Sequence, residues 1–176
     1  DIESQPFLES IRQFQHDVGH DNAILIHVTL IPYLRASGEM KTKPTQASVK
    51  ELQGMGIQPD VLVCRSEYPL TEDIRGKIAL FCNVPVSNVL QNLDVEYLYE
   101  APLAMEREKL ADVVLQSLRL ENRKPDLTDW ENMVENLRHP DKTVKIAMVG
   151  KYTQLHDAYL SVVEALKHGG ISCRAK

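Results

Sequence analysis

Hydrophobic and polar positions in the first third of the chain alternate between helical and strand-like patterns. Residues 4–18 predict a helix with Ser4 as its N-cap, because apolar side chains recur at helical spacing. The apolar face of this helix comprises Phe7, Leu8, Ile11 and Phe14. Residues 23–30 are apolar and β-branched, which predicts a buried strand. Residues 48–55 predict a second helix, and residues 60–64 a second strand.

The same alternation continues through the middle of the chain. A helix is predicted from Thr71 onward, and its apolar face comprises Ile74, Ile78 and Phe81. Residues 86–90 predict a third strand, and residues 102–118 carry an amphipathic pattern that predicts one long helix. Strands that alternate with helices are typical of an α/β fold, with a largely parallel sheet flanked by helices.

Residues 119–143 differ from what precedes them, because they are charged and carry two prolines. They predict an interdomain linker with one short helix, which a capping box at Thr128 would open. Beyond the linker, residues 144–149 predict a strand and residues 158–166 a helix, closed by the glycine pair at 169–170. A single strand and helix cannot bury their own apolar faces, so we expect this tail to be poorly ordered unless something else covers it.

Composition narrows the classes of protein to consider. The 176 residues are 43% hydrophobic, which is the apolar content of a soluble globular protein. The net charge of −5 gives no reason to expect nucleic acid or an anionic membrane as a partner. No apolar run approaches the roughly 18 to 20 residues that span a bilayer, so a cytoplasmic location is expected. The cysteines are widely spaced, which indicates neither a disulfide framework nor a zinc site, and Cys64 and Cys82 are expected in the core.

The main candidate site is a segment rich in lysine and threonine around Pro44. A residue before proline is pushed toward extended geometry, so Lys41 and Lys43 are predicted to project to the same side. Thr45 or Ser48 is expected to cap the helix that follows. Lysines beside a helix N-terminus are typical of a phosphate site. An exposed basic loop is the competing interpretation, because paired surface lysines are common.

Several segments resemble one enzyme family in the same order. The run Lys-Thr-Lys-Pro-Thr-Gln at residues 41–46 is similar to a motif of CTP synthase, the glutamine-dependent amidotransferase that converts UTP to CTP. Further segments that resemble the family are residues 1–4, 6–9, 27–33, 64–66, 77–84 and 148–152. Together they extend over nearly the whole chain, so the sequence is identified as a member of that family.

The resemblance implies which residues bind which nucleotide. UTP as substrate, or CTP as inhibitor, is expected at Asp1, Ile2, Glu3, Lys41, Thr42, Lys43, Pro44, Thr45, Gln46 and Lys77. ATP is expected at Arg65, Leu93, Asp94 and Val95. From the residues alone, Lys77 also fits a solvated lysine at a helix edge, and Asp94 an exposed aspartate that caps a turn. Asp1 and Glu3 offer carboxylates suited to magnesium or a nucleotide, and as first residues they also fit a frayed terminus.

A domain division follows from the same resemblance. Residues 1–118 are expected to be the C-terminal part of an incomplete, P-loop NTPase-like amidoligase domain. Residues 119–143 are then the linker, and residues 144–176 the first β-α unit of a glutamine amidotransferase domain. The family's phosphate loop and magnesium-binding acids are expected before residue 1, and its glutaminase triad after residue 176. We therefore expect neither catalytic residues nor a metal site in this chain.

The resemblance implies a ligase that forms a C–N bond. ATP phosphorylates the uracil 4-oxygen, and ammonia from glutamine then displaces the phosphate. Mg²⁺ and ATP are the expected cofactors, GTP the expected allosteric activator, and a homo-tetramer, in some members a filament, the expected assembly. A non-catalytic module that senses pyrimidine nucleotides or regulates assembly is the alternative.

The chain by itself is predicted neither to hydrolyse glutamine nor to form CTP, because the phosphate loop and the triad are expected to lie outside it. A glutaminase assay on the 176-residue chain measures the first half of this prediction. Ammonia release above background would contradict it.

Overall fold

The computed structural model describes residues 2–176, which divide into two compact units. The first unit comprises residues up to 96 together with 101–123, and the second comprises residues 97–100 and 124–176. The short segment 97–100 therefore belongs with the C-terminal part of the chain, although it lies between two stretches of the first unit.

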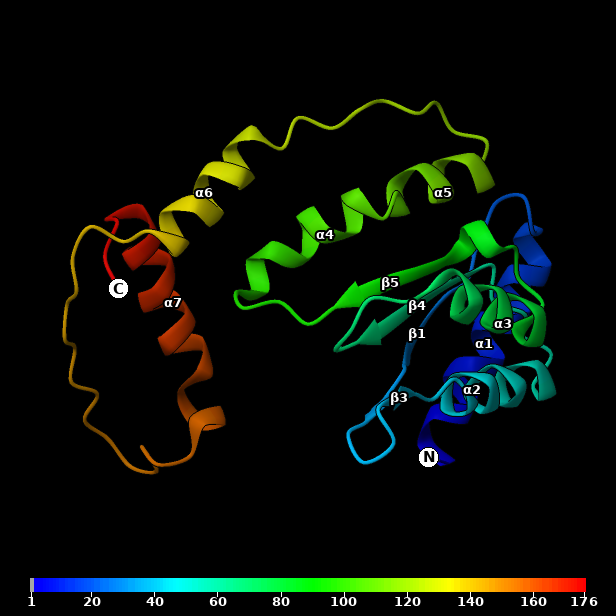
Figure 1. Cartoon of the computed structure of the whole chain (residues 1–176), viewed down its shortest axis with the longest axis horizontal. Coiled ribbons are helices and arrows are strands. Elements are labelled where there is room, and N and C mark those ends of the chain that lie inside the picture. The colour runs from blue at the N-terminus through cyan, green and yellow to red at the C-terminus, as the bar shows by residue number, and fades with distance from the viewer. Residues whose placement is uncertain (1) are drawn as a thin grey trace. The chain divides into compact units, whose positions relative to one another are not determined.

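A parallel sheet of three strands, in the order β1-β4-β5, forms the centre of the first unit. The strands are β1 (Ile26–Leu30), β4 (Val61–Ser66) and β5 (Val89–Leu93). Leu30 pairs with Arg65, and Ser66 pairs with Leu93, so the three carboxyl ends meet at one edge of the sheet. The predicted α/β fold, with a parallel sheet flanked by helices, is confirmed for this unit (Figure 1).

Helices α2 (Lys43–Gly54) and α3 (Glu72–Cys82) lie together along the sheet (Figure 1). The buried core that they share with the strands comprises Ile31, Val49, Leu62, Cys64, Leu70, Ile78, Ala79, Cys82, Val84 and Val89. Cys64 and Cys82 are thus core residues as predicted, and burial raises the pKa of the Cys82 thiol to about 11. This core fixes the face of the sheet against which α2 and α3 pack.

The predicted start of α3 is confirmed, whereas its predicted apolar face is only partly correct. The Thr71 side chain accepts a hydrogen bond from the Ile74 amide (3.3 Å) and so caps the helix. Ile78 is buried, but Phe81 is 60% exposed. The third strand, β5, lies later than predicted, because Val86–Asn88 form a 3-10 turn (η2).

Strand β1 exposes its apolar side chains and turns its polar ones toward α2. The predicted strand is present over Ile26–Leu30, but its predicted burial is wrong, because Ile26, Val28 and Leu30 are 42%, 59% and 58% exposed. The intervening His27 lies inward, with its Nε2 atom 2.8 Å from Ser48 Oγ of α2, and burial lowers its pKa. Successive side chains of a strand point to opposite faces, and over β1 only the face toward α2 is covered.

The long helix predicted over residues 102–118 is broken in two. The two helices are α4 (Ala101–Arg107) and α5 (Leu110–Ser117). Lys109 separates them in a left-handed conformation with φ of 62°. The adjacent Glu108 carboxylate accepts hydrogen bonds from Arg75 (3.0 Å) and from the side chain of Gln91 (2.9 Å). These bonds tie the break to α3 and β5, and such long-range contacts override helix propensity.

Helix α1 (Gln5–Val18) follows a 3-10 turn, η1 (Ile2–Ser4), which confirms the first predicted helix. Ser4 occupies the N-cap position with helical backbone angles, and its side chain makes no capping hydrogen bond. The predicted apolar face is largely exposed in this unit, since Phe7 is 73% and Phe14 63% accessible to solvent.

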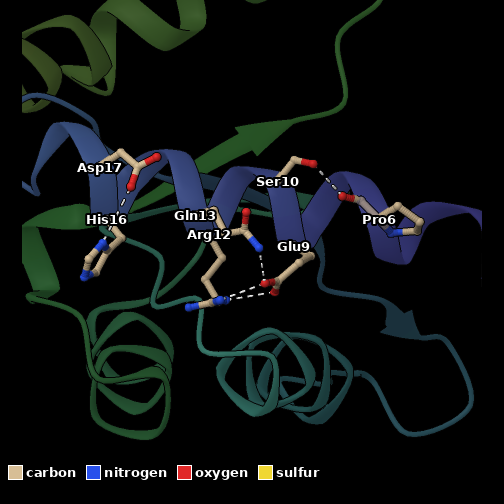
Figure 2. A network of polar contacts seen from close by, with 7 residues as sticks. All are labelled: Pro6, Glu9, Ser10, Arg12, Gln13, His16 and Asp17. Carbon is tan, nitrogen blue, oxygen red and sulfur yellow. Dashed lines mark hydrogen bonds and ion pairs between the residues drawn. The ribbon is translucent and has the colours of Figure 1, made fainter.

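Polar side chains of α1 form a row of contacts along the helix (Figure 2). Arg12 donates two hydrogen bonds to the Glu9 carboxylate, at 2.9 and 2.7 Å, and Gln13 donates another at 2.7 Å. The hydrogen bond from Arg12 is the main cause that lowers the pKa of Glu9 to about 2. Glu9 therefore holds the Arg12 side chain, whose Cδ atom would lie 3.1 Å from a Cβ added at Gly56.

The second unit contains two helices that pack on one another. They are α6 (Thr128–Arg138) and α7 (Leu160–Ser172), preceded by the 3-10 turn η4 (His156–Tyr159). Val134 and Ile171 are buried here. A further 3-10 turn, η3 (Leu98–Glu100), belongs to this unit through Tyr99, whose hydroxyl donates to the Glu164 carboxylate (2.9 Å) and contacts His168.

Three predictions for the second unit are wrong. Residues 144–149 form no strand. An isolated bridge pairs Lys142 with Ala175, and the Val144 amide donates to the carbonyl oxygen of Lys176 (2.7 Å), but no described strand continues this pairing along the segment. Helix α7 runs through the glycine pair at 169–170 to Ser172. Thr128 is the first residue of α6 and makes no cap, while its amide donates to Asp126 (3.1 Å).

Within residues 2–176, no helix combines the length and the apolar character that a membrane crossing requires.

Replacing Gly56 by alanine is predicted to destabilise the fold by about 1 to 3 kcal/mol, because its φ of +80° is a left-handed conformation that alanine adopts at a cost. Gly54→Ala is the matched control. Gly54 lies in α2 with nothing within 4 Å of an added Cβ, so the change is expected to be neutral or stabilising by up to about 1 kcal/mol. Urea unfolding followed by circular dichroism measures both, and equal midpoints for the two variants would contradict the prediction.

Candidate functional site

The lysine-rich segment enters α2 earlier than the sequence predicts. The helix begins at Lys43, with Pro44 in its first turn, so the predictions of an extended Lys43 and of a helix over 48–55 are wrong at the N-terminal end. The physical reason is that a proline needs no hydrogen-bonded amide in the first turn, and its fixed φ suits that position. Lys43 therefore lies on the first turn of the helix, next to its free amide groups.

Thr45 is buried against β1 and does not cap α2 as predicted. It is 1% exposed, and its Oγ1 atom lies 3.1 Å from the carbonyl oxygen of Leu30 and 3.1 Å from Thr29 Oγ1. Thr29 in turn donates to Cys64 Sγ (3.6 Å). Ser48, the other predicted cap, contacts His27 of the same strand. Both side chains thus fasten α2 to β1.

Other polar residues of the segment fix its shape from within. The Gln46 side-chain amide donates to Thr42 Oγ1 (3.0 Å), and Thr42 is 6% exposed. The backbone amide of Lys41 donates to the carbonyl oxygen of Pro32 (2.9 Å). Thr42, Thr45 and Gln46 are therefore engaged in holding the turn, which leaves the lysine side chains as the groups most available to a ligand.

Of the three lysines predicted to bind nucleotide, Lys41 pairs with an acidic residue and Lys77 acts on the same residue through its charge. Glu39 belongs to a small hairpin of strands β2 (Tyr33–Leu34) and β3 (Glu39–Met40), and its carboxylate forms an ion pair with Lys41 Nζ. The hydrogen bond from Lys41 lowers the pKa of Glu39, and the nearby charge of Lys77 on α3 contributes to the same shift. Lys43 is exposed and makes no ion pair with any residue from 2 to 176. The fold therefore brings Lys77 within electrostatic reach of the lysine segment.

The residues predicted to bind ATP also lie together, where β4 and β5 end. Arg65 Nη2 lies 3.6 Å from Asp94 Oδ1, and both side chains are more than half exposed. The Asp94 amide donates to the carbonyl oxygen of Ser66 (3.2 Å), which continues the pairing of the two strands. Leu93 and Val95 are partly buried on either side. Ligands of parallel α/β sheets bind at this carboxyl edge.

Other predicted residues are not brought to this edge by any described contact. Ile2 and Glu3 are exposed in η1, and no hydrogen bond or ion pair within residues 2–176 joins either of them to Lys41 or Lys43. Asp1 lies outside the described residues. Across the described residues, no three side chains of His, Cys, Asp or Glu gather as they would to ligate a metal ion. Two open hollows of about 360 and 740 Å³ lie in the second unit, along residues 152–158, and contain none of the predicted site residues.

Sequence reasoning missed two features of this edge. Glu39 stands two residues before Lys41, and side chains at that spacing share one side of an extended segment. This spacing could have predicted the ion pair between them. Tyr33 and Tyr68 contact each other, with ring centroids 4.4 Å apart, although they come from the hairpin and from the loop after β4. No local pattern in the sequence indicates this second contact.

Comparison with known proteins points to one family. A family model described as the CTP synthase N-terminus matches residues 1–120. The chain is similar to a CTP synthase of Ruminiclostridium cellulolyticum, with 60% identity over 171 residues that cover 97% of this chain and 32% of that protein. It is also similar to a CTP synthase of Symbiobacterium thermophilum, with 58% identity over 177 residues that cover 100% of this chain and 33% of that protein. The chain spans about a third of the length of these curated relatives.

Replacing Thr45 by valine is predicted to destabilise the fold by about 1 to 2 kcal/mol, because the new side chain has nearly the same volume and leaves the Leu30 carbonyl without its partner. Thr153→Val is the matched control, since Thr153 is exposed and the same substitution there should change stability by less than about 0.5 kcal/mol. Urea unfolding measures both variants. If Thr45→Val is as stable as Thr153→Val, the hydroxyl does not fasten α2.

Proposed function

The chain belongs to the CTP synthase family, and we propose that it contributes nucleotide-binding residues to an enzyme that aminates UTP to CTP with ATP and glutamine-derived ammonia. The observation that carries this proposal is the ion pair of Lys41 with Glu39 just before the first turn of α2, with Lys77 close enough for its charge to help lower the pKa of Glu39. Lysines that converge next to a helix N-terminus suit an anion with several charges, such as a triphosphate.

The lysine group is proposed to hold the triphosphate of UTP, or of CTP as a competing product. Lys41, Lys43 and Lys77 supply the positive charge, each as a point charge and not as a base. Thr42, Thr45 and Gln46 have mainly a positioning role in this proposal, because their hydrogen bonds are made within the fold. Pro44 presets the first turn of α2. Asp1, Ile2 and Glu3 complete the proposed pyrimidine site.

The ATP site is proposed at the ends of β4 and β5. Arg65 is exposed enough for its guanidinium to meet a ligand, and Asp94 orients it at 3.6 Å. Leu93 and Val95 would offer apolar surface to the adenine ring. Binding both nucleotides at one sheet edge would bring the phosphate donor and the uracil 4-oxygen together, which is the positioning that phosphoryl transfer requires.

The remaining parts of the reaction are proposed for other parts of the enzyme. In this proposal residues 1–118 belong to the amidoligase domain, residues 119–143 form the linker and residues 144–176 begin the glutaminase domain. The phosphate loop, the Mg²⁺ ligands and the glutaminase triad come from outside this chain, which spans about a third of its relatives. A cytoplasmic homo-tetramer that GTP activates completes the proposal.

Lys41→Ala and Lys43→Ala are each predicted to weaken UTP binding by about 1 to 3 kcal/mol, because each removes a charge-assisted contact to phosphate. Lys50→Ala is the matched control: Lys50 is exposed later in the same helix, and its loss should leave the affinity unchanged. Isothermal titration calorimetry of UTP with the full-length protein measures all three. Unchanged affinity in Lys41→Ala and Lys43→Ala would remove these residues from the site.

Turnover separates the enzyme from a nucleotide-sensing or assembly module. The full-length protein is expected to incorporate ammonia into UTP only when ATP is present. Tight UTP binding without any CTP formation would support the module and contradict the enzyme.

A further inference from the structure

Within residues 2–176, Glu39 is the only acidic residue that forms an ion pair with a member of the lysine group, and its partner is Lys41. It lies on β3, opposite Leu34 of β2, in the hairpin that delivers the chain to Lys41. The side chains of Lys41 and Glu39 are 40% and 52% exposed, so the pair sits at the surface and within reach of a ligand. A carboxylate inside a site for anions is unexpected on charge alone, and its presence needs a physical reason.

The geometry of an ammonium group supplies one. Lys41 ends in a flexible four-carbon chain, which takes many conformations unless something holds it. Its ammonium has three hydrogens to donate, so one bond to Glu39 leaves two for a phosphate. Glu39 therefore orders the side chain without using up its capacity to bind.

A second lysine falls under the influence of the same carboxylate. Lys77 lies on α3, and its charge lowers the pKa of Glu39 together with the hydrogen bond from Lys41. Two ammonium groups that face one ligand repel each other before the ligand arrives. The negative charge of Glu39 offsets part of this repulsion.

We propose that Glu39 is a positioning residue of the triphosphate site, which holds the Lys41 side chain before the nucleotide binds. This inference rests on the proposed function, since it assigns a role within that site. Glu39 itself does not contact the phosphate in this scheme. It acts through Lys41, so its effect on binding should disappear when Lys41 is absent.

An opposing effect is the negative field of Glu39, whose removal would by itself attract a polyphosphate more strongly. Both partners are substantially exposed, and water screens a field at such positions. The conformational restriction of the Lys41 side chain is not screened in this way. When Glu39 is removed, we therefore expect the loss of an ordered Lys41 to weaken nucleotide binding more than the loss of the negative charge strengthens it.

Calorimetric titration of UTP into the full-length protein tests the proposal with Glu39→Gln. The expected result is an affinity about three- to tenfold weaker, the loss that follows when the ligand must order a rotamer-rich side chain itself. Glu51→Gln is the matched control, because it removes the same charge from an exposed position of α2 and should leave the affinity unchanged. Glu39→Asp, which keeps the charge and shortens the reach, should fall between wild type and Glu39→Gln.

A double-mutant cycle with Lys41→Met separates positioning from general structural damage. In the Lys41→Met background, Glu39→Gln is expected to weaken UTP binding no further. An unchanged or tighter affinity in the single variant Glu39→Gln, or an equal loss in both backgrounds, would overturn the proposal. Failure of the wild-type protein to bind UTP would instead contradict the proposed function.

Discussion

The attachment of α2 to β1 is the interaction on which the candidate site depends. β1 turns His27 and Thr29 toward the helix, where they contact Ser48 and Thr45. Polar contacts therefore join the two elements, while the apolar side chains of β1 are exposed on its other face. Thr45 is almost completely buried, and a buried hydroxyl that lost its partners would cost free energy. Lys43 and Lys41 lie two and four residues before Thr45 in the chain, so this attachment fixes the backbone from which their side chains project.

Parallel pairing is the second constraint, because it places every strand end on the same side. The carboxyl ends of β1, β4 and β5 lead to the hairpin and lysine segment, to Arg65 and to Asp94 respectively. Residues far apart in the sequence therefore meet at one edge without any cavity having to form within the sheet. Helix α3 carries Lys77, whose charge acts on Glu39 of the hairpin. The strand order thus accounts for most of the grouping of the candidate site residues.

The motif at residues 41–46 divides into two kinds of residue. Thr42, Thr45 and Gln46 use their hydrogen bonds within the fold, whereas Lys41 and Lys43 keep charged groups at the surface. Residues of one motif can thus have different physical roles, one set holding a turn and the other meeting the ligand. The acidic residue beside the motif, Glu39, belongs to the first kind in its contacts, because its carboxylate pairs with Lys41 within the fold.

The sequence by itself determined the alternation of strands and helices, the parallel α/β fold of the first unit, the cap at Thr71 and the burial of Cys64 and Cys82, because these follow from local patterns of apolar and capping residues. Only the tertiary structure decided the features that depend on distant partners. The break at Lys109 follows from bonds of Glu108 to Arg75 and Gln91. Residues 144–149 lack strand structure, since no strand within residues 2–176 pairs along them. The inward face of β1 and the charge of Lys77 near Glu39 likewise required the fold, since sequence spacing carries no information about which elements pack together.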